Sequence, residues 1–233
     1  MSKADDHREA IRERKCQERE RRVQDILDAA KRLFFLKGYL KMTMDDIALE
    51  VRVSKPTIYQ YIKSKDELFF SLLTPSSEKT EKALGKIERN LLDGRYGSGS
   101  TLLHDVFQAL YLVYQADPDA FRILQLFQQS GMVWALNEDV RQNLVAKARI
   151  TFAQGRSILQ AAMEQGLIHR RDIYPLNDVV WALFIGIIQL EDTKSKGKDG
   201  NCFLKPTLEM AERLMIESMA TDGRGAECLK LEP

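Results

Sequence analysis

Helical periodicity is the feature that most limits the fold of this chain. Large apolar residues recur every three or four positions through most of the 233 residues, which is the spacing of one face of an α-helix. The pattern typical of strands, β-branched and aromatic residues alternating with polar ones between tight glycine turns, is nearly absent. No repeat of roughly 20 to 50 residues is visible, so solenoids and propellers are excluded. The sequence therefore predicts an all-α protein.

Start and stop signals divide this pattern into helices. A first helix is predicted from about Arg21 to Lys37, ending at Gly38, because glycine readily adopts the left-handed conformation that ends helices. A longer helix after residue 65 contains Pro75, which is expected to kink or divide it. Asp117-Pro118 should open one later helix and Asn177 should cap another. Further helices are predicted at about 101–116, 118–130, 138–164, 177–191 and 205–220.

The helices group into an N-terminal three-helix domain and a larger C-terminal helical domain. Residues 1–20 are charged, with Ile11 as the only large aliphatic side chain, so a disordered arm is expected there. The remaining parts are predicted as a DNA-binding domain over 21–70, a helical effector-binding and dimerisation domain over 71–222, and a flexible tail over 223–233. Glycine-rich residues 93–100 and polar residues 194–200 should be loops.

Composition indicates a cytoplasmic protein without a membrane span. The longest clean apolar run, Val179 to Leu190, is shorter than the roughly 20 residues that cross a bilayer, so a buried helix is expected. The charged N-terminus carries no apolar secretory segment. Three cysteines lie far apart (Cys16, Cys202 and Cys228), which favours reduced, inert thiols inside a cell.

The window from Thr43 to Leu68 carries the functional signal. Thr43 or a neighbour can cap a short helix, three turn residues follow, and Ser54 can cap a second short helix with Pro56 in its first turn. In that second helix Ile58 and Ile62 should face inward, which leaves its polar and aromatic side chains outside. Two short helices joined by a tight turn are typical of a helix-turn-helix.

The outward side chains suit the major groove of DNA. Lys55, Thr57 and Gln60 can bond base edges, whereas Pro56 and the Thr57 methyl can contact thymine methyls. Tyrosine and lysine side chains nearby are suited to phosphates, which fix register without reading sequence; these are Tyr59, Tyr61, Lys63 and Lys65. From Arg52 to Lys65 the chain has four basic residues and no acidic one. A solvated polar surface is the alternative interpretation of this pattern.

The pattern resembles the TetR family of one-component regulators. The resemblance extends from about Arg22 to Phe70 and is carried by Phe34, Gly38-Tyr39, Thr43-Met44, Asp46-Ile47-Ala48, Val53-Ser54-Lys55, Thr57-Ile58-Tyr59 and Lys63-Ser64-Lys65. It implies a dimer that binds a palindromic operator in double-stranded DNA. It further implies that Thr43 and Tyr59 touch phosphates, that Lys55 to Thr57 and Gln60 to Tyr61 face the major groove, and that Lys65 anchors the backbone. Arg52 stands where the family usually has glycine.

The second domain is expected to hold an effector. Its aromatic side chains fit an ordinary helical core, but the resemblance implies a pocket of apolar and aromatic side chains with a few polar groups. Candidate lining residues are Tyr111, Arg122, Gln125 and Trp134. No motif identifies the ligand.

A hairpin of the last two helices is the predicted dimer interface. Ala182 and Gly186 lie four apart in a nearly all-apolar helix, and small residues at this spacing allow close helix approach. Burial within one chain is the alternative, but twofold half-sites about 34 Å apart require two recognition helices. The residues assigned to this interface are Trp181, Ala182, Ile185, Gly186, Leu208, Ala211 and Met215.

Two other classes of function were weighed against a DNA-binding, ligand-responsive repressor. An enzyme is disfavoured because His7, His104 and His169 are scattered, and no catalytic spacing or phosphate-binding glycine loop is present. No catalytic residue, metal or cofactor is therefore expected. An RNA-binding or partner-binding helical module remains an alternative, which sequence-specific, salt-dependent binding to a duplex would distinguish.

Overall fold

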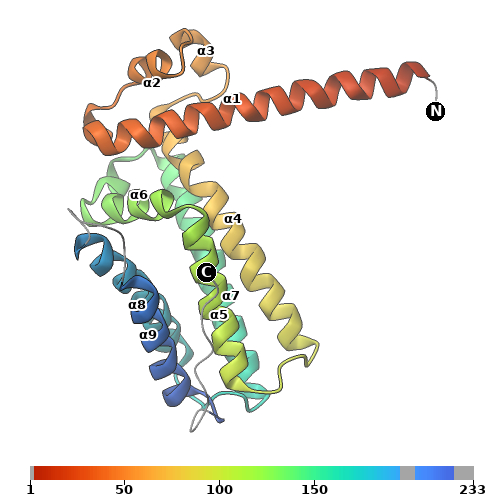
Figure 1. The fold of residues 1–233 in the computed structure, drawn as a ribbon, viewed down its shortest axis with the longest axis vertical. Coiled ribbons are helices and arrows are strands. Elements are labelled where there is room, and N and C mark those ends of the chain that lie inside the picture. Colours follow the sequence, from red (N-terminus) through yellow and green to blue (C-terminus); the bar gives the residue numbers. More distant parts are fainter. Residues whose placement is uncertain (1–2, 195–202, 223–233) are drawn as a thin grey trace. The chain divides into compact units, whose positions relative to one another are not determined.

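The computed structural model describes residues 3–194 and 203–222 (Figure 1). Within these ranges the regular elements are helices, and the only strand-like pairing is an isolated bridge between Ile168 and Ala220. The all-α prediction is therefore confirmed. Residues 195–200 of the predicted polar loop and the whole predicted tail lie outside the described residues. The helices are α1 (Lys3–Lys41), α2 (Met44–Glu50), α3 (Lys55–Tyr59), α4 (Lys65–Leu92), α5 (Gly99–Ala116), α6 (Pro118–Gln129), α7 (Glu138–Glu164), α8 (Ile173–Lys194) and α9 (Leu204–Met219), with a short 3₁₀ turn, η1, at Met132–Ala135.

The chain divides into two compact units. The first comprises residues up to Thr74 together with Ala135–Arg141, and the second comprises Pro75–Trp134 and the chain from Gln142 onward. The division falls about one helical turn after the boundary expected at residue 70. Residues 135–141 return to the first unit although they lie far along the chain, and within this segment Asn137 hydrogen-bonds Asp66.

Helix α1 differs from the expected disordered arm. Residues 3–20 continue the helix, and the side chains described between residues 7 and 22 are exposed. No glycine or proline interrupts the chain before Gly38, and residues such as Arg, Glu, Lys and Gln favour helix. Opposite charges three and four apart, such as Glu18 with Arg22, add support without burial. The helix propensity of these residues therefore stabilises this part of α1, which has no buried apolar face.

Gly38 ends the regular part of α1, as predicted. Its backbone has φ of 75° and ψ of 159°, a region that is essentially restricted to glycine. The side chains before it form the core of the first unit with residues of α2, α3 and α4. Among these buried side chains are Ile26, Ala30, Phe34, Ile47, Ile58, Leu68 and Phe69.

Helix α4 passes through Pro75 as one helical element, so the proline does not divide the helix. Proline removes one backbone donor, and the neighbouring turns retain their own bonds. Pro75 nevertheless coincides with the division between the two units.

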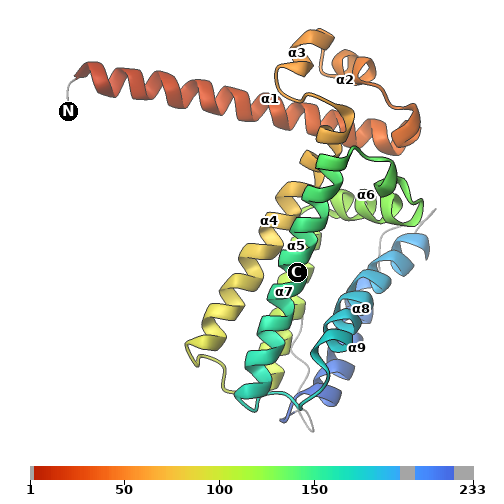
Figure 2. The same ribbon diagram turned by 180° about the vertical axis from the view of Figure 1, so that it is seen from behind.

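The second unit is a helical bundle whose core contains side chains from α4, α5, α7, α8 and α9. Helices α8 and α9 run side by side in both views (Figures 1 and 2). Asp117 caps α6 through a bond from the Ala120 amide, 3.1 Å long, with Pro118 at the first position as expected. The helices predicted at 101–116, 118–130, 138–164, 177–191 and 205–220 agree with α5 to α9 to within a few residues.

Helix α8 begins one turn earlier than predicted. It starts at Ile173, and the Tyr174 amide donates to Oδ1 of Asp172 at 3.1 Å. Asn177 therefore lies inside the helix and does not cap it. Of the described helices, α8 alone is long and apolar enough to cross a membrane by length and composition. Its apolar character has another explanation, because Val180, Phe184 and Ile188 are buried in the core.

Candidate DNA-binding surface and effector cavity

The first short helix of the pair is fixed by a capping box. The Asp46 amide donates to Oγ1 of Thr43 at 3.1 Å, and the Thr43 amide donates to Oδ2 of Asp46 at 2.9 Å. Lys37 donates to the other carboxylate oxygen at 2.8 Å. These hydrogen bonds, led by the one from Lys37, lower the pKa of Asp46 to about 2. Thr43 is exposed beside this cap, where a phosphate could reach it.

The turn between α2 and α3 has the geometry of a Schellman motif. The Val53 amide donates to the Ala48 carbonyl at 2.9 Å, and the Arg52 amide donates to Leu49 at 3.2 Å. Arg52 occupies the left-handed position of this motif with φ of 56°, and among the described residues it is the only non-glycine at positive φ. This position favours glycine, which explains why the family pattern has glycine here.

Helix α3 presents an exposed polar face. Ser54 caps it, accepting from the Thr57 amide at 3.3 Å, and Ile58 is buried beneath it. Lys55, Pro56 and Gln60 are exposed, and Tyr59 is 42% exposed. Figure 1 shows α3 lying over α1 beside α2. Most of the side chains that were predicted to meet DNA are thus gathered on one short helix and its caps, whereas Thr43 caps α2 and Lys65 begins α4.

Four of the predicted residues have partners inside the protein. Lys55 donates to Oδ2 of Asp45 at 2.7 Å, a bond that raises the pKa of Lys55. The hydroxyls of Ser54 and Thr57 lie 2.8 Å apart in a hydrogen bond. Lys65 lies 4.2 Å above the Tyr39 ring centre, and burial lowers the pKa of this lysine. DNA would therefore have to replace or share these contacts.

Tyr61 is placed differently from its expected position in the major groove. It is partly buried and lines a small hollow together with Arg22 and Ile26 of α1, and the guanidinium of Arg19 lies 5.5 Å from its ring centre. It follows the end of α3, where the chain turns back toward α1. Packing in the first unit therefore accounts for most of its surface.

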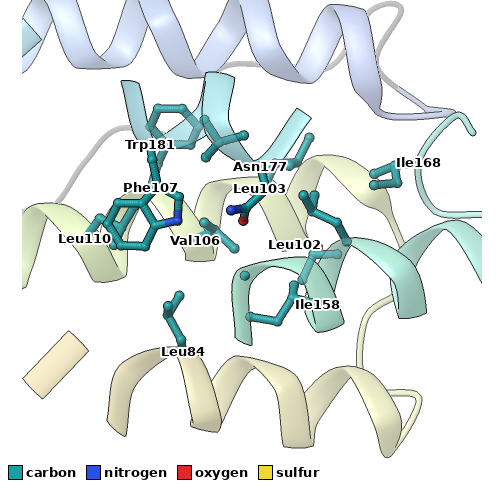
Figure 3. A pocket seen from close by; sticks show the side chains of 13 residues that line it. Leu84, Leu102, Leu103, Val106, Phe107, Leu110, Ile158, Ile168, Asn177 and Trp181 are labelled. Atoms are coloured by element: carbon teal, nitrogen blue, oxygen red, sulfur yellow. The ribbon is translucent and has the colours of Figure 1, made fainter. Parts of the chain in front are cut away.

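An apolar cavity lies in the second unit (Figure 3). The cavity has a volume of about 30 Å³, which is room for only two or three water molecules. Except for one asparagine and one tryptophan, its lining is apolar and uncharged. The lining residues are Leu84, Leu102, Leu103, Val106, Phe107, Leu110, Gly155, Ile158, Leu159, Ile168, Asn177, Val180 and Trp181.

None of the four predicted effector residues lines this cavity. Tyr111 is buried and accepts a hydrogen bond from Gln115 at 3.1 Å, and Gln125 donates to the Ile185 carbonyl at 3.3 Å. Arg122 is held by Asp192 through bonds of 2.9 and 3.1 Å. Trp134 is 74% exposed. Arg122 and Gln125 thus join α6 to α8, Tyr111 is part of the core, and Trp134 lies on the surface. The sequence did not predict this, because helical spacing alone does not show which apolar face encloses a cavity.

Sequence reasoning missed Asn177 and Gly155 as cavity residues and assigned Trp181 to the dimer interface. Asn177 is 2% exposed, and Trp181 stacks on Phe152 with ring centres 5.5 Å apart. The sequence contains two signals for this cavity. One is Asn177, a polar residue at helical spacing from Val180, Trp181 and Phe184 in an apolar helix, and the other is Gly155, a glycine inside a helix.

The predicted dimer residues fall into two groups. Leu208, Ala211 and Met215 are buried in the core of the second unit, so for these three the alternative of burial within one chain holds. Ala182 and Gly186 are exposed on α8, and Ile185 is partly exposed. Val179 and Leu190 extend the exposed apolar face of α8, and Met210 and Leu214 are exposed on α9.

The fold and the geometry of α2 and α3 identify this chain as a helix-turn-helix protein with a separate helical second unit. Residues 26–72 match the sequence model of the bacterial regulatory proteins, tetR family. The chain is 26% identical over 164 residues to the uncharacterized HTH-type transcriptional regulator YhgD of Bacillus subtilis (strain 168), covering 70% of this chain and 80% of that protein. It is 41% identical over 73 residues to the HTH-type transcriptional regulator HbdR of Aromatoleum sp. (strain CIB), covering 31% of each.

Solved structures show the same fold across both units. PfmR from Thermus thermophilus, a TetR family transcriptional regulator, has a TM-score of 0.67 at 18% identity and covers 83% of this chain and 97% of its own. AibR in complex with isovaleryl coenzyme A and operator DNA has a TM-score of 0.62 at 18% identity, covering 83% and 97%. FadR from Bacillus subtilis in complex with stearoyl-CoA has a TM-score of 0.60 at 19% identity, covering 80% and 96%. Residues 26–72 thus carry the DNA-binding domain of the TetR family, and the chain has the fold of TetR family transcriptional regulators.

Proposed function

We propose that this regulator is a cytoplasmic homodimeric repressor whose affinity for a palindromic operator is controlled by a small, largely apolar effector bound in the second unit. The observation that supports DNA recognition most directly is the α3 surface. Ile58 anchors this helix in the core while Lys55, Tyr59 and Gln60 remain exposed. A short helix of this kind can present polar side chains to base edges in the major groove.

Each exposed side chain of α3 is assigned a role from its chemistry. Gln60 has both a donor and an acceptor, and this pair matches an adenine edge. The Tyr59 hydroxyl and Thr43 are suited to phosphates. Lys55 releases Asp45 and bonds DNA in its place. Pro56 and the Thr57 methyl contact thymine methyls. Lys65 supports the phosphate contact from the start of α4.

The dimer is supported by the exposed apolar faces of α8 and α9. Val179, Ala182, Gly186 and Leu190 follow one another at helical spacing and are exposed in a single chain. Glycine and alanine at two central positions allow a second helix to approach closely. A second copy of the chain would bury this surface, and a twofold dimer supplies the two recognition helices that a palindrome requires.

Effector control is supported by the helices that connect the units. Helices α4 and α7 contribute residues to both units, and both also contribute cavity-lining residues, among them Leu84 and Ile158. The open space is small, so an occupant must move lining side chains apart. A ligand that binds the expanded state better would shift the population of helix positions and hence the operator affinity. AibR and FadR, which have the same fold, are in complex with acyl-CoA compounds.

The test compares two variants of α3 against random DNA duplexes. Tyr59→Ala should weaken binding to all duplexes about tenfold, because it removes a hydrogen bond to a charged phosphate. Gln60→Ala should change the preferred bases at one position in each half-site, a loss of about 1–3 kcal/mol in discrimination. Gln24→Ala, which removes an exposed amide from α1, is the control. If both α3 variants select the same duplexes with the same affinity as the parent, this docking is wrong.

A further inference from the structure

An unsatisfied amide lies in the wall of the effector cavity. Asn177 is 2% exposed, and within the described part of the chain its Nδ2 has no hydrogen-bond partner. Figure 3 shows this amide group among aliphatic side chains. A buried donor without an acceptor is destabilising, and native proteins contain few of them. Its persistence needs a reason, and a bound molecule that accepts the hydrogen bond supplies one.

Gly155 makes room for this amide. A Cβ added at Gly155 would lie 2.4 Å from Oδ1 of Asn177 and 3.5 Å from Nε1 of Trp181. Any larger residue at position 155 would therefore collide with the amide. Oδ1 of Asn177 and the Nε1 donor of Trp181, one turn apart on α8, thus lie beside a glycine on α7. This arrangement forms a small polar corner in an apolar cavity.

The charge of the lining limits the ligand further. The thirteen lining residues include no lysine, arginine, histidine or acidic residue. A carboxylate buried there would lack a counter-ion, and burial of an unpaired charge is very costly. A neutral oxygen, such as the carbonyl of a ketone, ester or thioester, accepts from Asn177 without this cost.

We infer that Asn177 is the polar anchor of the cavity, and that the effector is an aliphatic molecule with a neutral carbonyl oxygen that accepts from Nδ2. The inference rests on the proposed effector cavity and specifies the chemistry of its occupant. Asn177 selects for this oxygen, and the surrounding leucine, valine and phenylalanine side chains contact the aliphatic part. A free carboxylic acid in its ionised form is excluded at this position.

The test measures direct binding to the full chain with three probes of equal length: methyl pentyl ketone, heptane and heptanoate. Trp134→Phe serves as the background, because it leaves Trp181 in the cavity wall as the only tryptophan. The ketone should bind about tenfold more tightly than heptane, as one hydrogen bond provides, and heptanoate at pH 7 should bind most weakly. Equal affinities for ketone and alkane, a preference for heptanoate, or no binding of any probe would overturn the inference.

The variant Asn177→Leu separates an anchor from a structural residue. It should reduce ketone affinity about tenfold, leave heptane affinity unchanged or higher, and raise the Tm of the free protein, because an unsatisfied donor is removed. Val106→Ala is the matched control, since a trimmed apolar wall should lower both affinities by the same factor. A fall in Tm with equal loss of both probes would make Asn177 a packing residue and contradict the inference. Ketone binding that leaves operator affinity unchanged would instead count against the proposed function and leave the anchor intact.

Discussion

Arg52 shows at the scale of one residue how the helix-turn-helix stores a small strain. Its φ of 56° lies in the left-handed region, where a side chain costs about 1 kcal/mol relative to glycine. The two hydrogen bonds of the Schellman turn hold it there. The exposed guanidinium lies on the turn beside α3, where DNA would approach.

Arg52→Gly should therefore stabilise the first unit by about 1 kcal/mol, measured as the free energy of unfolding in urea. The same variant should weaken DNA binding if the guanidinium contacts a phosphate, so the two measurements should change in opposite directions. Arg32→Gly is the comparison within regular helix, where glycine should destabilise by about 1 kcal/mol. A loss of stability in Arg52→Gly would contradict the turn geometry.

Asp46 gives the first unit a defined response to acid. Its pKa is about 2 in the folded chain against 3.8 for an ordinary aspartate, so the ionised carboxylate stabilises the fold. This stabilisation is complete above pH 4 and is lost as the pH falls toward 2.

Unfolding of the parent and of Asp46→Asn should therefore differ most at neutral pH and converge near pH 2, followed by the helical circular dichroism signal during urea titration. Asp178→Asn, which changes an exposed carboxyl on α8, is the control. A difference between parent and Asp46→Asn that does not depend on pH would rule out the capping role of the carboxylate.

At the scale of elements, one buried polar pair joins α5 to α9. Nδ1 of His104 and Oε1 of Glu212 lie 2.7 Å apart, and the glutamate is fully buried. The sequence did not indicate this pair, because the partner of His104 lies more than 100 residues away. Long-range pairs of this kind follow from packing and leave no local signal.

His104→Leu should destabilise the second unit by about 3 kcal/mol, because it leaves a buried carboxylate without this partner. The double variant His104→Leu with Glu212→Leu should recover most of that loss, since apolar replacement of both members of a buried pair is often neutral. The measurement is urea unfolding of the three proteins. If the double variant is as unstable as His104→Leu, then the pair stabilises the fold by more than it costs to remove its two side chains from water.

Element positions followed from the sequence where local signals were strong. Asp117-Pro118 fixed the start of α6, and Thr43 and Ser54 fixed the starts of α2 and α3. Asn177 was mistaken for a cap because Asp172 and Pro175, which open α8 one turn earlier, were not recognised as a start. The cavity could not be predicted, because Tyr111, Gln125 and Asn177 are all buried polar residues and only packing distinguishes which of them faces open space.

For the whole molecule, the exposed surface of α8 sets the expected assembly. Ala182→Glu places a charge on the apolar face where a second copy is proposed to pack, so dimer dissociation should increase at least 100-fold, roughly 3 kcal/mol. Sedimentation should then give the mass of one chain where the parent gives twice that mass. Ala146→Glu, an exposed alanine on α7, is the matched control. A dimeric Ala182→Glu protein would exclude this face as the interface.

A second prediction at this scale concerns the start of α7. Oδ2 of Asp66 accepts from the backbone and side-chain nitrogens of Asn137 at 2.8 and 3.0 Å, and the Tyr39 hydroxyl donates to Oδ1 at 2.6 Å. The Asn137 side chain also caps α7, accepting from the Val140 amide at 2.9 Å. The first turn of α7 is therefore tied to the DNA-binding unit, and the same helix continues to Gly155 and Ile158 of the cavity.

Asn137→Asp should retain the cap while repelling Asp66. The effect of the ketone probe on operator affinity should then fall several-fold, while its affinity for the free protein stays within about twofold, because coupling is a free energy separate from binding. Operator affinity is measured with and without saturating probe, with Asp139→Asn as control. Unchanged coupling would show that this contact does not transmit occupancy of the cavity.

Recognition of operator DNA by a twofold dimer through α3 can be tested directly. The most direct measurement is selection of the full chain against random duplexes at two salt concentrations, with affinities measured for the enriched sequences. A twofold dimer should select a palindrome with half-sites about one helical turn, or a multiple of it, apart, and the affinity for this site should fall steeply as salt rises. Enrichment of a single asymmetric site, or no enrichment at either salt with ligand-free protein, would contradict it.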